Sequence, residues 1–93
     1  MIVGLLTVEM HLQGARSLKD KRMVLRGVKD RLKKFNVAVA EVEHQDLWQR
    51  ASLGVVTVGD STEFVDRALA AVTDEIERTE PGLITRTAIE FLT

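Results

Sequence analysis

The sequence predicts an α+β domain of the ferredoxin-like class, a βαββαβ sandwich with two helices on one face of a four-stranded antiparallel sheet. Two segments with apolar residues at every third or fourth position separate segments of alternating or continuous apolar character. Each helix is long enough for a crossover, and right-handed crossovers favour the strand order 4-1-3-2. No linker or low-complexity tract divides residues 1–93, so a single domain is expected.

The first strand is expected over residues 1–12. Its even-numbered positions from Ile2 onward are all non-polar, so that face is expected to be core throughout. Ser17 is then expected to be a helix N-cap, because Asp20 follows three residues later. The helix is expected to run to about Lys34, with an apolar stripe made of Leu18, Val24, Leu25, Val28, Leu32 and Phe35.

The second half of the chain repeats the order of strand and helix. The remaining strands are expected over residues 37–43, 51–59 and 83–92. A polar segment that holds the only Trp joins the first two of them. Asp60 with Glu63 predicts the start of the second helix, and Pro81 with Gly82 predicts its end. Its apolar stripe is expected to be Phe64, Val65, Ala68, Leu69, Val72 and Ile76.

Charge is distributed unevenly along the chain. The net charge is −1, but residues 16–34 hold nine of the thirteen basic residues and only two acids, a local charge of +7. At about 100° per residue, five cations of the first helix fall on one line beside its apolar stripe: Lys19, Arg22, Arg26, Lys29 and Lys33. Such a row suits a phosphate backbone. The alternative is a solvated basic face balanced by acids of the second helix, namely Glu63, Asp66, Asp74, Glu75 and Glu77.

The sheet face away from the helices is expected to be aliphatic. Its expected residues are Val3, Leu5, Val37, Val39, Leu53 and Val55, and none carries a ring on which an RNA base could stack. An uncovered patch of this kind favours a protein partner or a second copy, unless these are ordinary scattered strand residues. Trp48 is expected either to anchor an interface or to cover the edge of the core.

Catalytic and metal sites are not predicted. Without cysteine there is no thiolate nucleophile and no disulfide, which fits a reducing cytoplasm. The two histidines, His11 and His44, are too few for a structural zinc site. The third strand is expected to keep them apart from the acids that are nearby in sequence, namely Glu9, Glu41, Glu43 and Asp46. The apolar start of the chain has no basic leader and is expected to be a strand rather than a signal peptide or membrane span. We therefore expect a non-enzymatic protein without a cofactor.

Two stretches resemble a known family. Ser17-Leu-Lys-Asp-Lys-Arg22 and Ala40-Glu-Val-Glu-His-Gln-Asp-Leu-Trp-Gln49 are similar to the YlxP-like family of small bacterial proteins without an assigned function, and the resemblance extends over essentially the whole chain. It implies a ferredoxin-like fold. The family's genes tend to lie among those for translation initiation and ribosome maturation factors, which implies contact with RNA or the ribosome. It implies no catalytic or binding role for any residue.

Three functions remain in view. The first is an accessory protein that binds RNA or a ribosomal partner through the basic helix, for which five phosphate contacts to a single strand predict a log–log salt slope of about −3.5. The second is a homo-oligomeric interaction module that uses the aliphatic sheet face. The third is a small-anion sensor at the start of the first helix, where Arg16, Lys19 and Arg22 gather.

Overall fold

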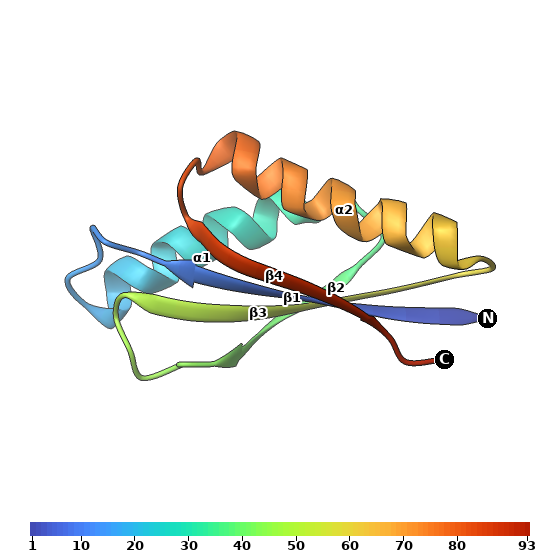
Figure 1. Ribbon diagram of the computed structural model, residues 1–93. Helices are drawn as coiled ribbons and strands as arrows, with labels where there is room; N and C mark the ends of the chain where they lie inside the picture. Colours follow the sequence, from blue (N-terminus) through green and yellow to red (C-terminus); the bar gives the residue numbers. More distant parts are fainter.

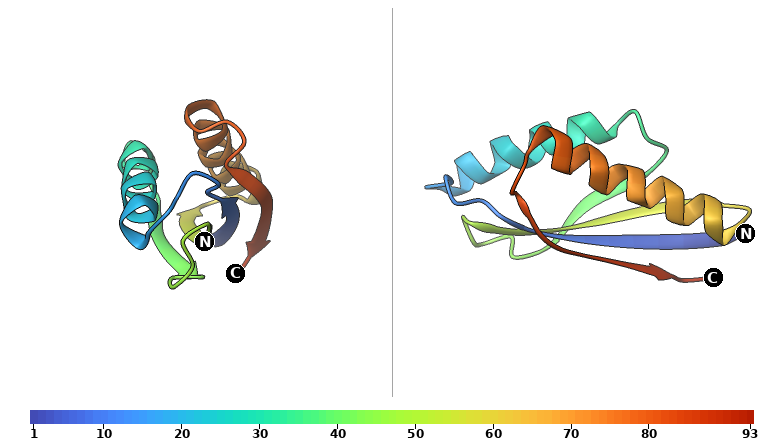
Figure 2. Two further views of the ribbon diagram at one scale, coloured as in Figure 1. Left: turned by 90° about the vertical axis from the view of Figure 1, so that its left-hand side faces the viewer. Right: turned by 45° about the horizontal axis from the view of Figure 1, so that its top comes forward.

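Four antiparallel strands form one sheet in the order β2-β3-β1-β4 in the computed structural model, which describes all of residues 1–93. The elements follow the chain as β1 (Ile2–His11), α1 (Leu18–Leu32), β2 (Ala38–Glu43), β3 (Arg50–Gly59), α2 (Thr62–Thr79) and β4 (Ile84–Phe91). Both helices cover the same face of the sheet, and the other face is left without a covering layer (Figures 1 and 2). The predicted ferredoxin-like fold and strand order are confirmed.

The core lies between the helices and the two central strands. The even-numbered side chains of β1 point into it, and Leu6 and Val8 are fully buried. Leu6 pairs with Val55 of β3, which places Val55 on the same, helix-covered face. The fifteen buried apolar residues form a single cluster that both helices contribute to.

Side-chain capping starts both helices. Ser17 accepts a hydrogen bond from the Asp20 amide, as predicted for α1. In α2 the cap is Ser61, which accepts a hydrogen bond from the Phe64 amide. Asp60, whose spacing to Glu63 predicted the start of this helix, is not the cap. Asp and Ser both cap helices well, and the shift of one residue changes no other part of the predicted helix. Phe64, expected in the buried stripe, is instead 54% exposed.

Gly4 allows α2 to lie close to β1. A Cβ atom at this position would stand 2.5 Å from Val65 Cγ1 and 3.0 Å from Leu69 Cδ1, both on the buried face of α2. A helix side chain can come this close to a strand only where the strand residue has no side chain of its own. The strand glycine therefore sets the depth at which α2 sits on the sheet.

Candidate nucleic-acid interface

The five cations predicted to share one line follow each other at intervals of three or four residues. Four of them lie on α1, and Lys33 is its C-cap residue. At 1.5 Å per residue the row is about 21 Å long. Leu25, Val28 and Leu32 turn toward the core on the adjoining side of the helix. The row therefore runs along the flank of α1 beside the edge strand β2.

Four members of the row have no carboxylate partner within the molecule. Lys33 Nζ lies 3.2 Å from Asp30 Oδ1, whereas no ion pair joins Lys19, Arg22, Arg26 or Lys29 to an acidic group. Like charges three or four residues apart on a helix repel each other. Repulsion within the row therefore destabilises α1, and a bound anion would reduce this repulsion.

The acids of α2 neutralise other cations. Glu75 Oε2 lies 3.1 Å from Lys34 Nζ and 2.9 Å from Arg78 Nη2. Hydrogen bonds from Lys34 first, and then from Arg78, lower the pKa of Glu75 below its usual value. Arg31 Nη1 lies 3.8 Å from Glu80. Glu75 and Glu80 reach the cations at the C-terminal end of α1 and pair with no member of the row.

A groove of about 390 Å³ follows the row, lined by Arg22, Leu25, Arg26, Lys29, Asp30, Lys33 and Glu41. Its two acids are each held by a lysine, because Asp30 is paired with Lys33 and Glu41 with Lys21. The groove therefore presents three unpaired cations, contributed by successive turns of one helix.

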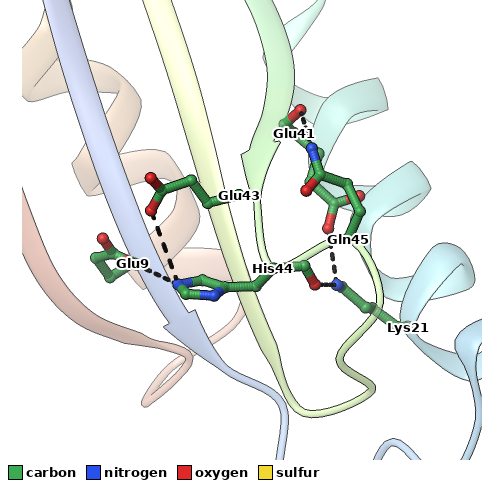
Figure 3. Close-up of polar contacts among 6 residues, drawn as sticks. All are labelled: Glu9, Lys21, Glu41, Glu43, His44 and Gln45. Carbon is green, nitrogen blue, oxygen red and sulfur yellow. Dashed lines mark hydrogen bonds and ion pairs between the residues drawn. The ribbon is translucent and has the colours of Figure 1, made fainter.

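Lys21 ties α1 to β2 through Glu41, one of the residues that line this groove. It is only 1% exposed, and its Nζ lies 2.7 Å from Glu41 Oε2 of β2 and donates to the carbonyl of His44 at 2.6 Å (Figure 3). Lys21 precedes Leu25 by four residues, on the side of α1 that faces the sheet. Sequence reasoning missed this contact because a lysine was not counted in the apolar stripe, although its spacing placed it there.

His44 corrects the expectation that β3 would keep the acids and histidines apart. Its ring reaches across β3, and Nε2 lies 3.8 Å from Glu9 of β1 and 4.0 Å from Glu43 of β2 (Figure 3). His44 adopts a left-handed backbone conformation, φ 65°, just after a register shift in β2, and this turns the ring back over the sheet. His11 does not join this group, and no three acidic or histidine side chains are placed to hold a metal ion.

Four of the residues expected on the open sheet face lie on the helix side instead. Leu53 and Val55 are fully buried in the core, and Val37 and Val39 pack against it at the edge. The registers explain this, since Val55 pairs with Leu6 on one side and Val39 on the other. Val3 and Leu5 are on the open face as expected, together with Ala38, Ala40, Val42, Val56 and Val58.

The open face holds a shallow apolar hollow of about 210 Å³ beside Leu5, Val42 and Val56. Trp48 is not part of it. The tryptophan lies on the loop between β2 and β3 and is 52% exposed, so it does not cover the core. Neither helix of the chain has the length and apolar content needed to cross a membrane.

The start of α1 already holds its own anion. Asp20 Oδ2 accepts a hydrogen bond from the Arg16 amide, while the Asp20 amide is bonded to Ser17 Oγ. A carboxylate at this end also complements the helix dipole. The small-anion hypothesis therefore loses part of its argument, because Asp20 already places a negative charge at this end of the helix.

Comparisons with known proteins agree with this fold. A family described as "Protein of unknown function (DUF503)" matches residues 3–89. A relative in Bacillus subtilis (strain 168), "Uncharacterized protein YlxP", is 39% identical over an alignment 93 residues long that covers 92% of this chain and 97% of the relative. A solved structure, "De novo designed protein Foldit4", has a TM-score of 0.55 at 12% identity and covers 99% of this chain and 96% of its own. That likeness concerns the fold alone.

Proposed function

The chain belongs to the DUF503 family, and we propose that it binds the phosphate backbone of RNA along the cationic groove of α1. The observation that carries the proposal is the unpaired row of Lys19, Arg22, Arg26 and Lys29, whose charges no acid of the molecule neutralises. Phosphate contacts of this kind hold a strand without reading its sequence. We infer no catalytic step from this surface.

The salt dependence of binding gives a quantitative test. Four unpaired cations that each contact one phosphate of a single strand predict a log–log salt slope of about −2.8, less steep than for five contacts because Lys33 is already paired. Replacing Lys19, Arg22, Arg26 and Lys29 together by Glu is expected to abolish RNA retention without changing the circular dichroism spectrum. Equal RNA binding by this variant would refute the proposal.

A matched pair of double variants distinguishes the effect of the row on RNA binding from the effect of the net charge of the protein. Arg26→Gln/Lys29→Gln removes two charges from the groove, whereas Arg67→Gln/Arg86→Gln removes two exposed charges from α2 and β4. The groove variant is expected to reduce the slope by about 1.4, since each lost contact to a single strand contributes about 0.7. The control is expected to bind as the wild type does. Equal losses in both variants would mean that only overall charge matters.

A second candidate function is self-association through the open sheet face. The observation that favours it is the aliphatic patch of Val3, Leu5, Val42, Val56 and Val58, which no helix covers. An uncovered aliphatic surface can pair with its own copy about a two-fold axis. Light scattering is expected to show a dimer that Leu5→Lys dissociates and that Ala70→Lys, on the exposed side of α2, leaves intact. A monomeric wild type at high micromolar concentration would remove this candidate.

A further inference from the structure

Trp48 is an exposed ring in a firmly held loop. It lies between β2 and β3, 52% exposed, beside Leu47, which is 45% exposed. The two side chains line a hollow of about 400 Å³ together with His11, Gln49 and Arg50. An indole that is left half in water, outside the core, offers a flat surface to a partner.

Hydrogen bonds fix both ends of this loop. At its start the carbonyl of His44 accepts from Lys21 Nζ at 2.6 Å and from the Leu47 amide at 3.0 Å. At its end Gln49 Nε2 donates to the carbonyl of Ala15 at 3.2 Å, and the Gln49 carbonyl accepts from the Leu12 amide at 2.8 Å. The backbone that carries Trp48 is therefore held in place before any ligand arrives, which lowers the entropy lost on binding.

The same hydrogen bonds place Trp48 at the end of the molecule where the cationic row begins. Ala15 lies three residues before the first residue of α1, and Figures 1 and 2 show the loop after β2 at the same end of the sheet as the start of that helix. Arg16 and Lys19 are exposed there, and Arg50 follows the loop at the start of β3. Asp46 is the only carboxylate within the loop.

We propose that Trp48 stacks on an unpaired base of the RNA strand whose phosphates lie along the row of α1. This inference rests on the proposed function and narrows its substrate class to single-stranded RNA. A duplex buries the faces of its bases in its own stack, so an exposed ring beside a phosphate track can be used only by an unpaired strand. Because stacking accepts any base, the strand is bound with little sequence preference.

The chain provides its own reporter for this contact. Trp48 is the only Trp and there is no Tyr, so the fluorescence of the protein comes from this one side chain. Single-stranded oligoadenylate is expected to quench that fluorescence on binding. Inorganic polyphosphate, which has the charges but no bases, is expected to bind the row without quenching, and a duplex of the same length is expected to quench little.

Two substitutions separate stacking from folding and from charge. Trp48→Leu is expected to weaken oligoadenylate binding by about 5- to 150-fold, the loss typical of one stacked base, with polyphosphate affinity unchanged. Trp48→Phe keeps a ring and is expected to keep most of the affinity. Arg26→Gln/Lys29→Gln is expected to weaken both ligands.

The outcomes distinguish the two proposals. If oligoadenylate binds without quenching, or binds Trp48→Leu as tightly as the wild type, the stacking inference is wrong and phosphate binding stands. If neither oligoadenylate nor polyphosphate binds, the proposed function fails as well. A fluorescence change that follows protein concentration alone would place Trp48 in a protein interface and overturn the inference.

Discussion

Replacing Lys21 by Met tests whether the buried ion pair holds α1 against β2. Methionine keeps most of the lysine stem but removes the ammonium group, which leaves Glu41 without its partner and the His44 carbonyl with the Leu47 amide alone. Removing one partner of a fully buried pair costs about 3–5 kcal/mol, because the remaining charge stays in a poorly solvated place. The Oε2 atom of Glu41 is buried, but the Glu41 side chain as a whole is 20% exposed, so we expect a smaller loss of about 2–3 kcal/mol.

For a domain of 93 residues this loss corresponds to a fall in Tm of about 10–20 °C. The assay is urea unfolding followed by circular dichroism, with slopes compared to confirm that both proteins unfold in the same way. The double variant Lys21→Met/Glu41→Leu removes both charges and is expected to regain most of the stability. A single variant within about 0.5 kcal/mol of the wild type, or a double variant whose losses simply add, would refute the reasoning.

Three further changes test how the two helices are held in the fold. Gly4→Ala is expected to cost about 1–3 kcal/mol by urea unfolding, because its Cβ would come within 2.5 Å of Val65; unchanged stability would show that α2 moves freely. Ser17→Ala removes the cap of α1 and is expected to cost about 1 kcal/mol, whereas Ser17→Asp is expected to keep the cap. The pKa of Glu75 is lowered in the folded protein, so its ionised carboxylate stabilises the fold above the unfolded value near 4.5, and this contribution is lost as the pH falls through the folded pKa. The difference in unfolding free energy between the wild type and Glu75→Gln is therefore expected to disappear in acid. A difference that stays constant with pH would contradict the assignment.

The sequence predicted which face of a strand is buried where the two faces of that strand differ in polarity. In β1 one series of alternate residues is wholly apolar, so its buried face was evident and the structure confirms it. In β3 both series are apolar, and the alternation alone could not tell Val55, which is buried, from Val56, which is on the open face. Only the pairing with β1 decides that question, and pairing depends on contacts between distant parts of the chain.

The cationic row could be predicted because it needs nothing beyond helical spacing. The contacts that position the groove and the loop could not, because they join residues far apart in the sequence. Lys21 reaches a carbonyl 23 residues away, and Gln49 reaches one 34 residues away. Both side chains look like ordinary surface residues until the fold brings their partners close.

Lys21 also connects the two surfaces that we propose for RNA. It belongs to the helix that carries the cationic row, and it holds the carbonyl at the start of the loop that carries Trp48. If the loop geometry matters, Lys21→Met measured at a temperature where it is fully folded is expected to weaken oligoadenylate more than polyphosphate. The fluorescence quenching of Trp48 is expected to fall as well.

Gly4→Ala is the matched control for this effect. It is expected to destabilise the domain by a similar amount, but through Val65 and Leu69 of α2, which take no part in the loop contacts. Its affinities for both ligands are therefore expected to match the wild type. If both variants lose affinity for oligoadenylate, the loss is caused by reduced stability of the domain and not by the position of the loop. If only Lys21→Met loses oligoadenylate, the buried lysine acts as a positioning residue, because it fixes the ring against which an unpaired base must lie.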